Sequence, residues 1–181
     1  MRLSYFLLVI FVLSFTDVKA QQTQGNYVIT RQGDTIKCEF SGKFWGRIKY
    51  RRDKQDSYHK IDTATIKEYY SQKDEATYRA LILPNTGKPA FVKLIEDGKI
   101  NLYELLIISN RSSTKYWYAC KDNKPAVEVD NTKLFHSNQN FKQNISNLLA
   151  DNSNAVQEYK QQMSYNFKTI KYLVHYYNSE R

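Results

Sequence analysis

Three histidines are the first residues to consider for chemistry, because imidazole is both a common general base and a common metal ligand. His59, His136 and His175 lie in unrelated segments. Zinc sites normally include two ligands close together in sequence, and these histidines form no such pair. No serine stands in a nucleophile-elbow pattern, and no glycine-rich loop could cradle a phosphate. We therefore expect no metal, no cofactor and ordinary surface or packing roles for the histidines.

Carboxylates could also do chemistry, since a glycosidase requires a pair of them. The acidic residues considered are Asp34, Glu39, Asp53, Asp56, Asp62, Glu68, Asp97 and Glu104. Nothing in their spacing selects two. Asp34 and Asp97 are better explained as turn residues whose side chains bond nearby backbone amides. A non-enzymatic function is therefore favoured, and a hydrolase acting on glycan or lipid with unassigned acidic residues is the alternative.

The most distinctive local feature is a run of cations. Arg47, Lys49 and Arg51 alternate with Ile48 and Tyr50, so in a strand they fall on one face. Such a stripe is a candidate site for an anionic ligand. The alternatives are a solvated strand face, or an edge strand whose charges deter unwanted pairing.

Aromatic clusters offer a second kind of binding surface, since aromatic rings can stack on sugars. The clusters are Phe44-Trp45, Tyr69-Tyr70 and Tyr116-Trp117-Tyr118. Adjacent strand residues point to opposite faces, so about half of each cluster is expected in the core. Trp45 and Trp117 are the candidate binding residues.

The chain has two cysteines, Cys38 and Cys120. Cys38 alternates with Ile36 and Phe40 and is expected to point into the core, whereas Cys120 ends an aromatic strand. A disulfide between them would close a long loop and stabilise the fold by about 4 kcal/mol. Two free thiols are the alternative, because the sequence does not show whether the two Cα atoms approach each other.

The elements that must position these residues are strands followed by helices. From residue 27 to about 129 the apolar pattern has mainly period two, which is typical of strands. Turn-like stretches at residues 31–34 and 96–99 predict hairpins. Further along, Phe141, Ile145, Leu148 and Leu149 share one helical face, and Phe167, Ile170, Val174 and Tyr177 share another. A polar break at 151–154 separates the two patterns, and residues 155–165 are ambiguous.

This order predicts an α+β domain. We expect an antiparallel sheet of about seven to nine strands, forming a curved sheet, a sandwich or a roll, followed by two to three C-terminal helices. Residues 26–130 are strand-rich and 134–179 helical, within a single domain over 21–181.

The N-terminus has the three parts of an export signal. Arg2 precedes an apolar run over residues 3–15, and a polar stretch ends in Val18-Lys19-Ala20. The run is shorter than the roughly 20 residues of a spanning helix. We therefore expect a cleavable signal peptide over 1–20, and no later membrane-spanning helix. The signal carries a net charge of +1 (Arg2 and Lys19 against Asp17), so the remaining chain keeps +8 of the total of +9.

Several short segments carry a resemblance to known proteins. They are Tyr27-Val28-Ile29-Thr30 with Gly33-Asp34-Thr35-Ile36, Phe91-Val92-Lys93-Leu94-Ile95 with Asp97-Gly98-Lys99 and Leu102-Tyr103-Glu104, and a closing Tyr177-Asn178. Through them the chain resembles a group of exported proteins of unknown function from Bacteroidota-type Gram-negative envelopes. The resemblance implies the same strand-then-helix order, and it supplies no catalytic residues that could be transferred to this chain.

These observations favour an exported protein of the periplasm or cell surface that is a non-enzymatic binding or interaction module. A basic protein attracts anionic partners. In an envelope these would be lipopolysaccharide or an acidic glycan, and another envelope protein is the further option. Nucleic acid is not expected as a partner, because export removes most opportunity to meet it. The hydrolase alternative would act in the same compartment.

Overall fold

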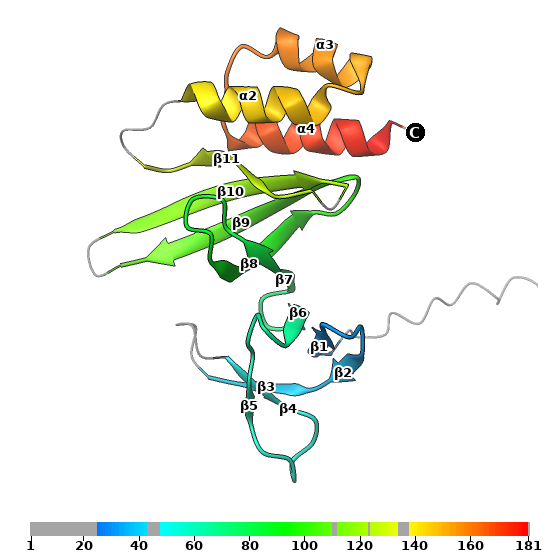
Figure 1. Cartoon of the computed structure of the whole chain (residues 1–181), viewed down its shortest axis with the longest axis vertical. Coiled ribbons are helices and arrows are strands. Elements are labelled where there is room, and N and C mark those ends of the chain that lie inside the picture. Colours follow the sequence, from blue (N-terminus) through cyan, green and yellow to red (C-terminus); the bar gives the residue numbers. More distant parts are fainter. Residues whose placement is uncertain (1–24, 43–47, 110–111, 123, 134–137, 181) are drawn as a thin grey trace, which may run out of the picture.

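The computed structural model describes residues 25–42, 48–109, 112–122, 124–133 and 138–180 (Figure 1). The predicted signal peptide, Trp45 and Arg47 lie outside these ranges. The described strands are β1 Tyr27–Thr30, β2 Thr35–Lys37, β3 Glu39–Ser41, β4 Lys49–Arg51, β5 His59–Lys60, β6 Ile66–Ser71, β7 Ala76–Ile82, β8 Pro89–Glu96, β9 Ile100–Ile108, β10 Ser113–Lys121 and β11 Val127–Asn131. The described helices are α2 Asn138–Leu149, α3 Ser153–Gln161 and α4 Phe167–Ser179.

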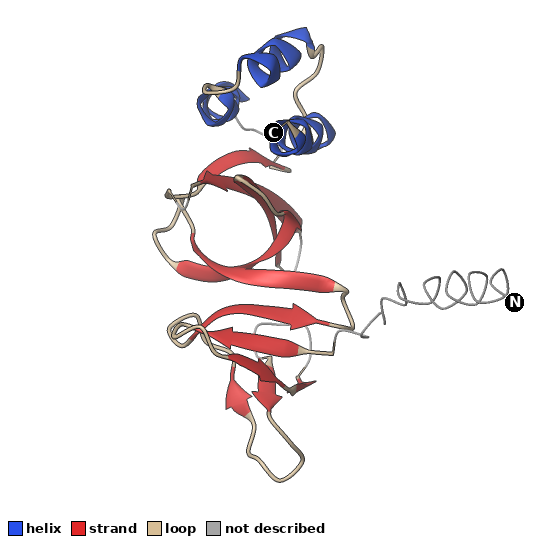
Figure 2. Ribbon diagram, turned by 90° about the vertical axis from the view of Figure 1, so that its right-hand side faces the viewer, coloured by secondary structure: helices blue, strands red, loops and turns tan. Residues whose placement is uncertain are grey.

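Eight strands form one antiparallel sheet in the order β11-β10-β9-β8-β7-β6-β1-β2, and β3, β4 and β5 form a small second sheet. From β6 to β11 each strand pairs with the next one in the chain, so this part is a meander of hairpins. Figure 2 shows that the strands directly below the helices bend round into a tight curl. The predicted α+β architecture, with an antiparallel sheet followed by helices, is confirmed.

The first hairpin lies where the sequence predicted it. β1 and β2 pair across a turn in which Gly33 has a φ of 101°, a left-handed conformation that glycine adopts without strain. The alternating residues Ile36, Cys38 and Phe40 do face a common cluster. However, they do not belong to one strand, because the chain leaves the large sheet after Lys37 and enters the small sheet at Glu39.

Three hydrophobic clusters hold the layers together. The first lies between the helices and β9–β11, and contains Leu102, Trp117 and Ile170. The second lies on the opposite side of the same strands, inside the curl, and includes Tyr118. The third joins β1 and β6 to the small sheet around Tyr69. Each end of the large sheet is therefore covered by a different layer.

The helices are set by their caps and apolar stripes. Asn152 accepts a hydrogen bond from the Ala155 N–H and begins α3, so the predicted break is a short turn and most of the ambiguous stretch is helical. Asn166 caps α4 in the same way. The α4 stripe is buried against β8 and β9 and contains Ile170, Leu173, Val174 and Tyr177. None of the three described helices is both long and apolar enough to cross a bilayer.

Candidate functional site

One face of the large sheet is covered at both ends and open between them. Cross-strand pairing places Trp117, Glu104, Lys93, Tyr78 and Tyr69 in one row along this face. Trp117 packs in the cluster under the helices, and Tyr69 packs in the cluster under the small sheet. The middle of the row, with Lys93 and Glu104, is therefore left as the floor of a groove between the two covers.

This groove has a volume of about 760 Å³, within the range of typical ligand sites. Its walls come from the small sheet and from β6 to β9. The lining residues are Ile48, Ile61, Tyr69, Asp74, Tyr78, Phe91, Lys93, Glu104, Leu105, Leu106, Ile107 and Ile108. The groove is therefore mainly apolar and contains three charged side chains.

Two of these charged groups, Asp74 and Lys93, differ in whether they are hydrogen-bonded. Asp74 accepts a hydrogen bond from the Tyr78 hydroxyl at 3.4 Å. Burial and the nearby Asp74 raise the pKa of Tyr78 to about 12, so its hydroxyl stays protonated and can donate. The side chain of Lys93 makes no hydrogen bond or ion pair with another described residue. Lys93 is thus a cation on the groove floor without a directly bound counter-charge.

Trp117, a predicted binding residue, belongs to the core. It is 7% exposed, and its ring stacks on Phe167 of α4 with 4.3 Å between centroids. Its Nε1 donates to Glu104 at 3.0 Å, and Lys115 Nζ donates to the same carboxylate at 3.3 Å. A ligand cannot stack on Trp117, because the helix occupies that side of β10.

Strand β9 continues beyond the last pair that it makes with β8. The β8–β9 ladder ends at Lys93 and Glu104, although β8 begins at Pro89 and β9 runs on to Ile108. Residues 105–108 pair only with β10 among the described strands. Figure 1 shows β9 and β10 reaching past the rest of the sheet as a two-stranded arm. We call residues 105–108 and 113–115 the arm.

The arm exposes apolar side chains and a strand edge. Leu106, Ile107 and Ile108 are 42, 48 and 40% exposed. The N–H of Ser109 donates to the Ser112 carbonyl at 2.8 Å, so odd-numbered residues of β9 bond toward β10. Leu106 and Ile108 consequently direct their N–H and C=O groups away from β10, toward the side on which β8 no longer pairs with β9. No described residue pairs with that side of them.

The predicted cationic stripe is on the small sheet. Lys49 and Arg51 lie on β4, which is the central strand, so the edge-protection interpretation does not apply to them. Their outward direction is as predicted, since Tyr50 between them packs in the core. Arg51 is already occupied, because its guanidinium donates to Glu39 at 2.8 and 3.0 Å. Lys49 lies directly opposite Lys60 on β5.

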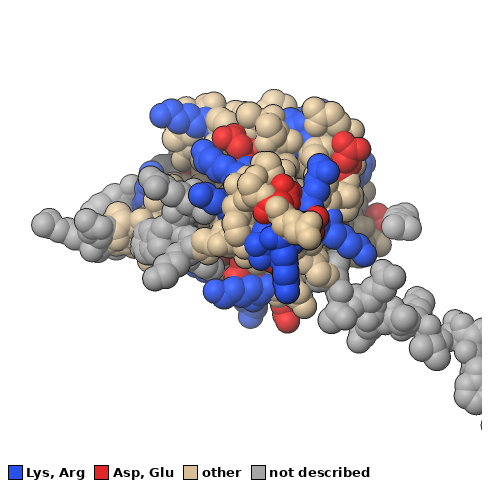
Figure 3. Space-filling view, turned by 90° about the horizontal axis from the view of Figure 1, so that it is seen from below, with Lys and Arg blue, Asp and Glu red and all other residues tan. Residues whose placement is uncertain are grey.

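Figure 3 shows this end of the molecule, with cations gathered among several acidic side chains. The stripe is therefore less positive than the spacing of the cations suggests. Arg47 and Trp45 lie outside the described residues, so Lys49 and Arg51 are the predicted contacts that can be placed.

The two cysteines do not form the disulfide that the sequence left possible. Cys38 and Cys120 are free thiols. Cys38 packs beside the small sheet, where burial raises the pKa of its thiol to about 11. Cys120 lies inside the curl, and its Sγ donates to the Tyr103 hydroxyl at 3.8 Å. Strand β10, which carries Cys120, is separated by five strands from β2, which ends just before Cys38.

A second, polar hollow of about 850 Å³ lies where the β8–β9 turn meets α4 and the turn after α2. The Asn178 side chain bridges to β9 there: its Nδ2 donates to the Ile100 carbonyl at 2.9 Å, and its Oδ1 accepts from the Ile100 N–H at 3.0 Å. A Cβ at Gly98 would lie 2.5 Å from Asn178 Cγ, so this approach requires glycine. Two of the segments that carry the family resemblance therefore meet in a structural contact.

Asp151 is the most strongly bound acid of this hollow. It accepts hydrogen bonds from Lys121, from Lys99 at 3.2 Å and from the Tyr177 hydroxyl at 3.1 Å. These bonds, that from Lys121 above all, hold the pKa of Asp151 well below its usual range. The carboxylate thus ties the turn after α2 to the sheet and to α4.

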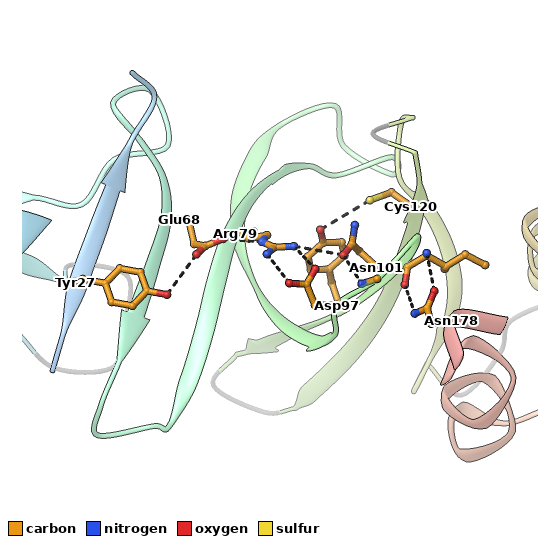
Figure 4. A network of polar contacts seen from close by, with 10 residues as sticks. Tyr27, Glu68, Arg79, Asp97, Asn101, Cys120 and Asn178 are labelled. Atoms are coloured by element: carbon orange, nitrogen blue, oxygen red, sulfur yellow. Dashed lines mark hydrogen bonds and ion pairs between the residues drawn. The ribbon is translucent and has the colours of Figure 1, made fainter. Parts of the chain in front are cut away.

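A network of hydrogen bonds around Arg79 occupies two further acids (Figure 4). Arg79 donates to Glu68 at 2.6 Å and to both oxygens of Asp97 at 2.9 and 3.0 Å. It also donates to Asn101 Oδ1 at 3.3 Å. The bonds to Asp97, followed by those to Glu68, raise the pKa of Arg79. Asp97 is therefore more than the local turn residue that was predicted, because it fastens the β8–β9 turn to β7.

Both described histidines form exposed pairs with acids. His59 lies 3.5 Å from Asp56, and His175 on α4 lies 2.9 Å from Glu96 on β8. His136 is outside the described residues. Among the residues that the structure describes, no group of three or more His, Cys, Asp or Glu side chains is placed to hold a metal ion.

The groove and the arm were missed in the sequence analysis, although one signal was available. Leu105, Leu106, Ile107 and Ile108 form an unbroken apolar run at the end of a strand that otherwise alternates. A strand with one solvated face should not carry such a run. No sequence pattern marked Lys93 as a site residue. Its place on the groove floor depends on where the helices and the small sheet stop covering the large sheet, and both are distant in sequence.

Comparison with known proteins adds no relative: neither the family models, nor the curated proteins, nor the solved structures include a match to this chain.

Proposed function

We propose that this protein is a non-enzymatic binding module, exported to the periplasm or cell surface, whose ligand site is the groove between the small sheet and the arm. The observation that carries the proposal is the open stretch of sheet floored by Lys93 and walled by exposed apolar residues. Of the two acids in the groove, Glu104 accepts from Lys115 and Trp117, and Asp74 accepts from Tyr78. Acids elsewhere, such as Asp97 and Asp151, are occupied by structural partners, which gives the hydrolase alternative little support.

The groove favours a ligand with an apolar body and one anionic group. Covering a half-exposed leucine or isoleucine contributes about 1 kcal/mol, so Leu106 and Ile108 together supply an appreciable part of a micromolar affinity. An anion beside Lys93 adds a charge-assisted hydrogen bond. Export is consistent with the signal-like N-terminus and is part of the proposal.

An apolar, anionic fluorescent dye, anilinonaphthalene sulfonate, tests the site directly. We expect the folded protein to bind it, and Leu106→Gln and Lys93→Gln each to lower the affinity at least about fivefold. Ile82→Gln is the matched control, because Ile82 is 57% exposed on β7 but does not line the groove. Equal binding by Leu106→Gln and the parent would overturn the assignment of the site.

A second candidate function is binding of a polyanion by the outer face of the small sheet. Its support is the placement of Lys49 directly opposite Lys60: Lys60 is paired with Asp62 at 3.4 Å, whereas Lys49 makes no hydrogen bond or ion pair with a described residue. A double variant, Lys49→Gln with Lys60→Gln, should bind lipopolysaccharide more weakly than the parent at low salt, and the difference should shrink as salt rises. Lys73→Gln, an exposed lysine in the β6–β7 turn, is the control. Unchanged binding by the double variant would mean that this face is only solvated.

A further inference from the structure

We propose that the arm accepts an additional β-strand from a partner protein, paired to the free edge of residues 105–108. This inference rests on the proposed function, because the added strand would lie in the same groove. It goes further by assigning the ligand to a chemical class, an extended peptide segment.

The main chain of β9 is the first reason. Leu106 and Ile108 each direct one N–H and one C=O away from β10, and no described strand pairs with them. An acyl chain could fill an apolar groove, but it could not bond these groups. A peptide strand does both, because its backbone continues the ladder while alternate side chains enter the groove.

The other reason is the state of the arm without a partner. Beyond Lys115, which still bonds Thr132 after β11, the described sheet consists of two strands, residues 107–108 and 113–114, and a two-stranded ribbon is marginally stable on its own. Three consecutive apolar side chains of the arm are exposed. Across the groove, residues 89–92 of β8 also pair with no described residue on the side facing β9. An added strand would therefore complete the sheet where it has split.

Charge complementarity indicates the kind of segment. The added strand must stop where β8 resumes pairing, which is at Lys93. An acidic side chain near that end of the peptide would meet the Lys93 ammonium. A second copy of this chain fits less well, because its own residues 105–108 contain no acid and its Glu104 is already bonded to Lys115 and Trp117. We therefore assign the strand to a different protein, with alternating apolar residues and an acid at one end.

The probe is a labelled, end-blocked peptide of six residues, alternating valine and threonine with one terminal glutamate. We expect fluorescence anisotropy to report saturable binding to the full protein. Exchanging the glutamate for glutamine should weaken binding about three- to tenfold with the parent protein but not with Lys93→Gln. An equal loss in both proteins would overturn the role of Lys93.

Strand pairing is tested by N-methylation, which removes amide hydrogens without altering the protein. Two peptides are compared, each methylated on one alternate set of residues. At least one should lose more than about tenfold in affinity, since strand addition uses alternate amides. If both methylated forms bind like the parent peptide, the strand inference is wrong.

A protein variant provides the reciprocal test. Leu106→Pro removes an outward N–H but no bond to β10, and should reduce peptide binding by a similar factor. Ile82→Gln serves as the control here too, because Ile82 is an exposed strand residue that does not line the groove. If the dye binds the groove but no peptide does, the strand inference fails and the proposed site stands. If neither binds, both fail. A dimer in sedimentation that Leu106→Pro dissociates would identify a second copy as the occupant and overturn the assignment to a different protein.

Discussion

Gly98 and Asn178 form a pair whose coupling can be measured. Replacing Asn178 by alanine leaves the N–H and C=O of Ile100 without partners at a position where the Ile100 side chain is fully buried. An unpaired buried polar group costs about 1–3 kcal/mol, and this backbone is only partly buried. We expect Asn178→Ala to lower the free energy of unfolding by about 2–3 kcal/mol.

Gly98→Ala should lower the free energy of unfolding by nearly the same amount, but for an indirect reason. Its new Cβ would lie 2.5 Å from Asn178 Cγ, so the amide must move out and give up both bonds to Ile100. In the Asn178→Ala background that obstacle is absent, and alanine additionally restricts the unfolded chain. The double variant should therefore lose about 2–3 kcal/mol rather than the sum of about 4–6 kcal/mol.

Urea unfolding of the parent, the two single variants and the double variant gives the four free energies. Each kcal/mol corresponds to about 2–4 °C in Tm for a chain of this size, so thermal unfolding is an independent check. The reasoning is refuted if the two single costs simply add, because the variants would then act through separate interactions.

Four other results are expected. Alkylation of the unfolded, unreduced protein should modify both Cys38 and Cys120, whereas in the folded state Cys38 should react slowly below about pH 9, since burial raises its pKa to about 11; a mass lacking two additions would indicate a disulfide. The pKa of Asp151 is lowered by folding, so its contribution to stability is present above about pH 4 and is lost as the pH falls, and Asp151→Asn should flatten the stability profile in that acidic window. Truncation before Asn166 removes α4 and its buried stripe, worth several kcal/mol at roughly 25 cal/mol per Å², and circular dichroism should show a large loss of Tm. The intact mass of protein from the cell envelope should correspond to a chain beginning at Gln21, and recovery of the uncleaved chain from the cytoplasm alone would contradict export.

Much of the fold follows from local patterns in the sequence. Alternation located the strand-rich part of the chain, because a half-buried sheet imposes period two on the residues it contains. The last helix was predicted from its stripe of apolar residues. The split between β2 and β3 was not predictable, because the chain keeps the same alternation while it moves from one sheet to another.

The sites depend on contacts that periodicity does not encode. Asn178 meets Ile100 across 78 positions, and neither residue type predicts the other. Tryptophan is a residue type common in binding surfaces, but Trp117 lies in the core. The sequence pattern did not show this, because the helix that covers Trp117 is distant in sequence. Arg51 had the position of a free cation and is bonded to Glu39 on the neighbouring strand. In each case the local pattern gave the direction of the side chain, and the partner came from the tertiary fold.

The strand order also predicts the order in which the parts of the molecule fold. Because β6 to β11 pair successively, most of the large sheet can form from hairpins with short loops, which close quickly. The α4 contacts join segments almost eighty residues apart, so they close a much longer loop than the hairpins do. We therefore expect the meander to form early and the helical layer to dock late, so that variants in α4 chiefly accelerate unfolding and leave the folding rate nearly unchanged.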